Sequence, residues 1–295
     1  MSSAHEPVMV AEVLTLLKPG RGGLFVDCTV GLGGHSRALL EAGAARVLGL
    51  DRDLSALALA RETLAAFSDR IELVHADYRE LDRVLDERGI ERVAGTLADL
   101  GVSSMQLDGE GRGFSFRRDE PLDMRMDQSR GPSVADLLRD VPETELADVI
   151  FQFGEERHSR RVARAIVTAR RESPIETTGR LAAIVRRAVP YKGHQRIDPS
   201  TRTFQALRIW VNRELDGLDA FLAHATRRLL ANARLAVITF HSLEDRVVKH
   251  TFRALEKTGD GLRILTKRPL VPADEEVVRN PRARSAKLRA IERFA

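Results

Sequence analysis

Apolar residues along the first hundred positions follow two alternating patterns. Short apolar runs typical of buried strands occupy residues 24–28, 46–50, 71–75 and 93–98. Between the second and third runs, an amphipathic stretch places Leu57, Ala60, Leu64 and Phe67 on one helical face. This alternation predicts a parallel sheet wrapped by helices, and therefore an α/β fold.

The pattern changes after the fourth predicted strand. Residues 106–213 show no convincing strand pattern, and helical periodicity dominates there, for example over 149–169 and 181–189. The α/β pattern then returns with a helical face over 218–229 and with strands over 235–240, 262–266 and 287–294. We therefore expect a Rossmann-like sheet built from residues 1–105 and 214–295, with a helical domain, residues 106–213, inserted after the fourth strand.

The composition is that of a globular protein. Of the 295 residues, 43% are hydrophobic and 31% are charged, and no apolar run approaches the roughly 18 residues that a membrane span needs. A single cysteine, Cys28, excludes an intramolecular disulfide and a zinc site built from several cysteines. The first residues also lack the basic and apolar segments of a secretory signal, so we expect a cytoplasmic protein without a membrane partner.

A glycine-rich turn, Gly31 to Gly34, separates the first predicted strand from the first helix. Glycine permits positive φ and lets a ligand approach the backbone, so the turn indicates a nucleotide-type cofactor. Asp51, at the end of the second strand, is placed to accept hydrogen bonds from both hydroxyls of an adenosine ribose. NAD and S-adenosylmethionine both need this contact. Ser36 stands where the dinucleotide fingerprint has its third glycine, which weakens the case for NAD. A tight turn without a ligand is the alternative.

Longer motifs make the pattern more specific. Asp99 ends the fourth strand, and the carboxyl ends of parallel strands are where α/β sheets bind ligands. Eight stretches carry recognisable sequences: 5–8 (HEPV), 27–36 (DCTVGLGGHS), 99–104 (DLGVSS), 112–116 (RGFSF), 121–127 (PLDMRMD), 204–209 (FQALRI), 240–246 (FHSLEDR) and 280–285 (NPRARS). On these stretches, over nearly its whole length, the chain resembles the bacterial ribosomal RNA small-subunit methyltransferase H family.

The resemblance implies an enzyme that transfers a methyl group from S-adenosyl-L-methionine to the exocyclic N4 of a cytidine in small-subunit (16S) ribosomal RNA near the decoding centre. Carried onto matching positions, the family's cofactor contacts are Gly33, Gly34, His35, Asp51, Tyr78, Asp99 and Gln106. Two departures concern loop geometry: Met105 stands where the family usually has proline, and Asn232-Ala233 replaces a pair of glycines before the fifth strand.

Methyl transfer from a sulfonium requires alignment of the acceptor and a place for the charge that moves onto nitrogen, and it needs no metal. We predict that Asp99 and Ser103 accept hydrogen bonds from the cytosine amine and that His241 takes its proton. Phe240 offers a ring for stacking on the base. A core-packed Phe240 and a structural His241 are equally open, and residues 244–246 are expected to begin a capped, ion-paired helix.

Arginine outnumbers lysine by 41 to six, and the planar guanidinium suits phosphate. A GC-rich genome would produce the same excess, so only local clustering indicates a nucleic acid. Six arginines and no acid lie within residues 157–171, and further basic clusters occupy 186–213 and 279–289. We predict that the clusters contact the RNA backbone, with ordinary solvated helix faces as the alternative. The specific RNA-binding candidates are Arg202, Arg208, Arg282 and Arg284.

Other functions stay open on the sequence. A methyltransferase of DNA or protein would use the same cofactor, although residues 100–102 (LGV) replace the Pro-Pro-aromatic step common after the strand-four acid in amino-methyltransferases. A non-catalytic RNA-binding assembly factor would keep the fold without turnover, and a nicotinamide-dependent oxidoreductase would need a Tyr-x-x-x-Lys signature that the chain lacks. The sequence does not specify the target nucleotide, the choice between naked RNA and the 30S subunit, or the oligomeric state, for which a homodimer is one option.

Overall fold

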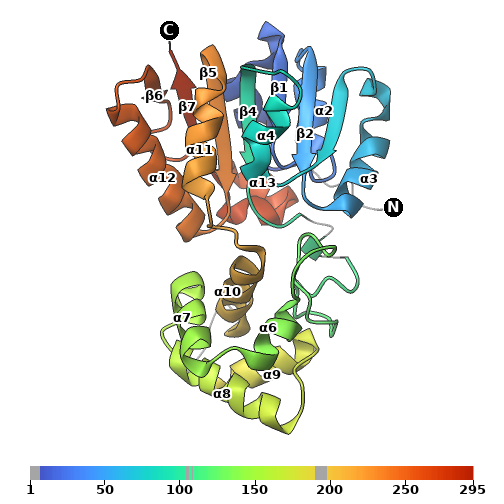
Figure 1. Ribbon diagram of the computed structural model, residues 1–295, viewed down its shortest axis with the longest axis vertical. Coiled ribbons are helices and arrows are strands. Elements are labelled where there is room, and N and C mark those ends of the chain that lie inside the picture. Colours follow the sequence, from blue (N-terminus) through green and yellow to red (C-terminus); the bar gives the residue numbers. More distant parts are fainter. Residues whose placement is uncertain (1–6, 104–105, 108, 190–197, 295) are drawn as a thin grey trace. The chain divides into compact units, whose positions relative to one another are not determined.

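The computed structural model describes residues 7–103, 106, 107, 109–189 and 198–294. It divides into two compact units, one formed by Met1–Gly101 with Leu215–Ala295 and the other by Val102–Glu214 (Figure 1). Several residues of the sequence motifs and basic clusters lie outside the described ranges, namely His5, Ser104, Met105, Lys192 and Arg196. Among the described residues, no helix has the length and apolarity to cross a bilayer.

The first unit is built on a seven-stranded sheet with the order β3-β2-β1-β4-β5-β7-β6. The strands are β1 Leu24–Asp27, β2 Arg46–Asp51, β3 Ile71–His75, β4 Val93–Asp99, β5 Leu229–Thr239, β6 Leu262–Ile264 and β7 Lys287–Arg293. β1 to β5 pair in parallel, while β7 runs antiparallel to both β5 and β6. The predicted α/β, Rossmann-like sheet is confirmed.

Helices cover both faces of this sheet (Figure 1). One core lies between the strands and α4 Leu81–Asp86, α11 Leu218–Arg227 and α12 Ser242–Lys257. The opposite core lies under α1 Val10–Leu17, α2 Gly34–Glu41 and α3 Leu54–Thr63. The remaining helical segments of this unit are α13 Asp274–Arg279 and the 3₁₀ turns η1 Pro19–Arg21, η2 Ala65–Phe67, η3 Tyr78–Glu80 and η4 Pro281–Ser285. Both faces are therefore apolar, which explains the continuous apolar runs of the parallel strands.

The helix predicted over 218–229 ends at Arg227, and β5 begins at Leu229 instead of Leu235. The first part of β5 contains Asn232, whose φ is +62°, and the register against β4 shifts between Val93 and Gly95. Asparagine is one of the few residues that tolerate this left-handed conformation. It therefore adopts the conformation that a glycine would favour at this position.

The second unit is helical and has its own apolar core. Its helices are α6 Val134–Asp140, α7 Glu143–Gly154, α8 Ser159–Glu172, α9 Thr178–Ala188 and α10 Ser200–Asn212. Between residues 102 and 214, the only β pairing among the described residues is an isolated bridge from Pro121 to Thr177.

The helical pattern over 149–169 belongs to two helices, because the structure ends α7 at Gly154 and begins α8 at Ser159. Glu155 has φ +50° and ends α7. At Gly154, a Cβ atom would lie 2.5 Å from the backbone oxygen of Arg202, so only glycine lets α10 approach this closely. The periodicity of apolar residues continues through the break, and this continuity made two helices look like one.

Candidate active site

The turn between β1 and α2 exposes backbone at the carboxyl end of the sheet. Gly31 and Gly33 have φ values of +54° and +87°, which glycine adopts without strain. A Cβ atom on Gly31 would have no neighbour within 4 Å, whereas one on Gly34 would lie 2.9 Å from Pro7. Gly31 therefore faces open space, and Gly34 allows the N-terminal segment to pack on α2.

Asp51, the last residue of β2, holds this turn in place. Its carboxylate accepts hydrogen bonds from the backbone N–H groups of Gly31 and Asp53, each at 2.8 Å. Burial raises the pKa of Asp51 to about 6. An ionised carboxylate has about four lone-pair sites, so Asp51 can accept further hydrogen bonds from a ligand.

Asp99 ends β4 and presents a buried polar atom. Its backbone N–H donates to the hydroxyl of Thr29 at 2.6 Å, which fixes the strand end against the glycine turn. Oδ2 lies 3.6 Å from Nδ1 of His35, while the buried Oδ1 has no hydrogen-bond partner among the described residues. The pKa of Asp99 is raised to about 6, and burial is the largest cause of this shift.

His35 in α2 and Asp27 at the end of β1 lie on the two sides of the glycine turn. Nε2 of the buried His35 ring lies 2.9 Å from the carbonyl oxygen of Val8, which can only accept, so Nε2 carries a proton and Nδ1 faces Asp99. Asp27 is fully buried and accepts a hydrogen bond from the Ser36 hydroxyl at 2.7 Å. Sequence reasoning missed Asp27; the available signal was Ser36, a hydroxyl where the dinucleotide fingerprint has glycine.

Tyr78, the predicted adenine partner, begins η3 and is mostly buried. Its ring packs on Phe221 with centroids 4.7 Å apart, and burial raises its pKa. The adjacent Asp77 is held by Arg79 at 2.7 Å and by Arg52 at 3.4 Å. A contact between Tyr78 and adenine stays a prediction.

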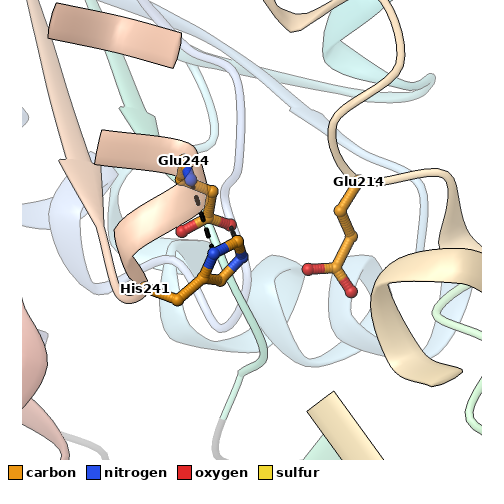
Figure 2. Close-up of side chains that lie close together, drawn as sticks. All are labelled: Glu214, His241 and Glu244. Carbon is orange, nitrogen blue, oxygen red and sulfur yellow. Dashed lines mark hydrogen bonds and ion pairs between the residues drawn. The ribbon is translucent and has the colours of Figure 1, made fainter. Parts of the chain in front are cut away.

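Figure 2 shows His241 and Glu244 at the start of α12. Nδ1 of His241 accepts a long hydrogen bond, 3.4 Å, from the backbone N–H of Glu244. Glu244 in turn places Oε1 3.0 Å from Nε2 of His241 and Oε2 2.9 Å from the backbone nitrogen of Phe240. The capped helix start is as predicted. The role of His241 as a proton acceptor stays a prediction, and it would compete with the helix cap.

The Phe240 ring lies against the backbone of Gly101, just after β4. A Cβ atom on Gly101 would lie 2.8 Å from the ring, and the φ of Gly101 is +123°. Gly101 therefore needs to be glycine both for its conformation and for the ring to approach. The ring of Phe240 is only partly buried.

Ser103 and Gln106 belong to the second unit and bind each other. The backbone N–H of Ser103 donates to the Gln106 side chain at 3.0 Å, and the Ser103 hydroxyl accepts from the backbone N–H of Gln106 at 3.2 Å. This reciprocal arrangement is that of a capping box. The catalytic role of Ser103 and the cofactor contact of Gln106 stay predictions.

The arginines predicted to bind RNA have different surroundings. Arg208 is only 17% exposed and donates two hydrogen bonds, at 2.9 and 2.8 Å, to Glu214, the acid also drawn in Figure 2. Arg202 is 56% exposed, with one guanidinium nitrogen 3.8 Å from Glu156. Arg282 and Arg284 lie in η4, where Arg284 is exposed. All four stay predictions, and Arg208 would have to leave Glu214 to meet a phosphate.

The first unit offers partners for three polar parts of S-adenosylmethionine. The free lone pairs of Asp51 suit the ribose hydroxyls, the backbone N–H groups at the start of α2 suit the methionine carboxylate, and Oδ1 of Asp99 suits the ammonium group. A buried polar atom without a partner costs about 1–3 kcal/mol, and more when it is charged, unless a ligand supplies the donor. The residues present therefore fit this cofactor.

Comparison with known proteins supports the same assignment. A model of the MraW methylase family matches residues 2–294. The ribosomal RNA small subunit methyltransferase H of Nitrobacter hamburgensis is 51% identical over 304 residues, which cover 99% of this chain and 91% of that protein. The protein of the same name from Nitrobacter winogradskyi is 52% identical, covering 98% and 90%, and the one from Sorangium cellulosum is 51% identical, also covering 98% and 90%. The chain belongs to the MraW methylase family.

Proposed function

We propose that this protein transfers a methyl group from S-adenosylmethionine to the exocyclic N4 of a cytidine in small-subunit ribosomal RNA. The family match and the names of the relatives support a methylase that acts on this RNA. The choice of N4 follows from the resemblance in sequence motifs around Asp99 and Phe240. A ribosomal substrate also agrees with the expected cytoplasmic location.

One observation carries the proposal furthest, namely the buried Oδ1 of Asp99 without a hydrogen-bond partner among the described residues. It lies beside a glycine turn with an open backbone, at the carboxyl end of β4, the central strand of the sheet. This is where open α/β sheets bind ligands. Asp99 can therefore accept a hydrogen bond from the methionine ammonium or from the acceptor amine.

The bound cofactor would supply an electrophilic methyl group on a sulfonium. The chain itself has to bind, orient and accept protons. Asp51 holds the nucleoside end, and the Thr29 hydroxyl fixes the backbone of Asp99. A cytosine amine is a weak nucleophile because its lone pair is delocalised into the ring. An N–H···O hydrogen bond to a carboxylate such as that of Asp99 favours pyramidalisation of the amine nitrogen. It also stabilises the positive charge that develops on this nitrogen.

Phe240 fits the base. Its ring is partly exposed beside Gly101, and its backbone N–H donates to Glu244, which in turn contacts the His241 ring. Stacking between a base and an aromatic ring is sequence-tolerant and contributes about 1–3 kcal/mol. Phe240 would therefore position the cytosine, while the acid and the cofactor select the amine.

The proposal is tested with purified protein, S-adenosylmethionine labelled in its methyl group, and 30S subunits that lack the modification. We expect the label in N4-methylcytidine after digestion of the RNA to nucleosides and mass spectrometry. Label in DNA or in a ribosomal protein would support one of the other methyltransferase functions. Binding to 30S subunits without any label transfer would support the assembly factor.

A further inference from the structure

Helix α8 of the second unit, Ser159–Glu172, has two distinct faces. Its buried residues are Val162, Ala163, Ile166 and Val167. At about 100° per residue, the arginines 160, 161, 164 and 171 fall within an arc of roughly 100° on the other side of the helix. We call Arg160, Arg161, Arg164 and Arg171 the α8 arginine row.

The charges of the row are largely uncompensated. Arg160, Arg161 and Arg171 are all exposed. Among the described residues, none of the three has an ion pair or a side-chain hydrogen bond. Arg164 is 77% exposed and approaches one acid, Glu143, at 3.3 Å. Within the helix itself the first acid is Glu172, its last residue.

Several other arginines of the same unit are held by partners. Arg186 binds Asp198 at 2.8 Å, and Arg208 binds Glu214 through two hydrogen bonds. Arg170 donates to the backbone oxygens of Leu138 and Val141, which ties α8 to the end of α6. A phosphate that approached these groups would have to displace an existing acceptor. A phosphate that approached the α8 arginine row displaces only water and counterions.

We propose that the α8 arginine row binds the phosphate backbone of the ribosomal RNA substrate. This inference rests on the proposed function and adds the surface that holds the substrate. Guanidinium groups match phosphate through paired donors. The row contains no aromatic or aliphatic side chain, only Thr168 beside the arginines, whereas the centre of a protein interface is typically apolar. The chemistry of the face therefore favours a polyanion over a protein.

The test compares two triple variants that remove the same charge. Arg160→Gln, Arg164→Gln and Arg171→Gln together remove three charges of the row, and glutamine keeps the helix propensity close to that of arginine. The matched control combines Arg83→Gln, Arg118→Gln and Arg139→Gln, each of which is exposed and lies beside an acid. A third variant with lysine at 160, 164 and 171 keeps the charge of the row.

Binding of each protein to deproteinised 16S ribosomal RNA and to 30S subunits is titrated at several salt concentrations. Each lost phosphate contact flattens the slope of log affinity against log salt by about 0.7 to 0.9, so the glutamine triple should flatten it by about two to three units. The control and the lysine triple should keep the wild-type slope. Cofactor affinity should be unchanged in all four proteins, which shows that the first unit is intact.

An unchanged slope in the glutamine triple would overturn the inference, as would equal flattening in the control, which would mean that only net charge matters. Weaker binding to 30S subunits with unchanged binding to free RNA would assign the row to a ribosomal protein and also overturn it. These outcomes are distinct from failure of the proposed function. In that case the wild-type protein itself would bind these substrates but transfer no methyl group to cytidine N4.

Discussion

At the residue scale, the carboxylate of Asp51 orders the glycine turn, and we propose that it also accepts hydrogen bonds from the hydroxyls of a ribose. Hydrogen bonds to a charged group contribute about 1.5–3 kcal/mol, so Asp51→Ala should weaken S-adenosylmethionine binding by roughly 10- to 100-fold. Calorimetric titration measures this affinity. Asp69→Ala, which removes an exposed acid of the same unit, is the control, and equal affinities for the two variants would show that Asp51 does not hold the ribose.

Asp99 is the residue on which turnover should depend most. Asp99→Ala removes the buried acceptor and should lower the single-turnover rate on the order of 10²-fold at saturating cofactor and RNA. Ionised Asp99 accepts hydrogen bonds from N–H groups more strongly than the neutral acid, and its pKa in the cofactor-free protein is raised to about 6, so the kcat/KM of the wild type should fall as the pH drops below about 6. A wild-type rate in Asp99→Ala would leave Ser103 and His241 as the catalytic candidates.

The raised pKa of Asp99 also predicts how stability depends on pH. The ordinary value is 3.8 and the folded value is about 6, so between these values the folded protein binds more protons than the unfolded chain. The free energy of unfolding of the cofactor-free protein should therefore fall as the pH rises from about 4 to about 6, by up to about 1.4 kcal/mol per pH unit from this group. Asp27 and Asp51 have similarly raised pKa values and add to the same trend.

Urea denaturation at several pH values measures this slope for the wild type and for Asp99→Asn. We expect a shallower slope in the variant, because it has lost one of the three titrating groups. Carboxyls whose pKa is lowered, such as Asp77 and Asp123, act in the opposite direction and mainly below about pH 5, and they cancel in the comparison because both proteins contain them. Identical slopes for the two proteins would mean that Asp99 does not bind a proton in the folded state at these pH values.

Among the elements, those with buried apolar runs were predictable from the sequence, and those shaped by a single close contact were not. β1 to β4 match their apolar runs to within a residue or two, because parallel strands are buried on both faces. The first part of β5 escaped prediction because residues 230–232 are exposed and Asn232 is left-handed. The break at Gly154 escaped prediction because it depends on the backbone of α10, far away in sequence.

The motif loop 121–127 is anchored by the last residue of α10. The amide of Asn212 donates to the backbone oxygen of Met124 at 2.7 Å and accepts the backbone N–H of Met126 at 2.7 Å. Met124 has φ +60° and is fully buried, so the loop needs this support. Asn212→Ala leaves buried backbone groups unpaired and should lower the free energy of unfolding of the second unit by about 3 kcal/mol.

Thermal unfolding together with limited proteolysis of the loop tests this prediction. Asn212→Asp keeps an acceptor for the N–H of Met126 but loses the donor to Met124. We therefore expect this variant also to be less stable than the wild type. If both variants unfold and are cleaved like the wild type, other contacts hold the loop.

For the molecule as a whole, the sequence predicted where the candidate site lies, and the structure supplied the contacts between its residues. The rule that ligands bind at the carboxyl ends of parallel strands was enough to select Gly31, Asp51 and Asp99. The contacts between Asp27 and Ser36 and between His35 and Asp99 depend on how side chains meet after packing, which periodicity does not encode. The same is true of Arg208, whose charge is compensated by Glu214.

The central claim is that this chain methylates a cytidine N4 in small-subunit ribosomal RNA by means of Asp99. The most direct measurement is mass spectrometry of the nucleosides of that RNA from cells with the wild-type protein, without it, and with Asp99→Ala in its place. We expect N4 methylation of one cytidine in the first cells and its loss in the other two. The same N4-methylated cytidine at full level in cells without the protein would contradict the proposed activity, and its retention with Asp99→Ala alone would contradict the proposed role of that residue.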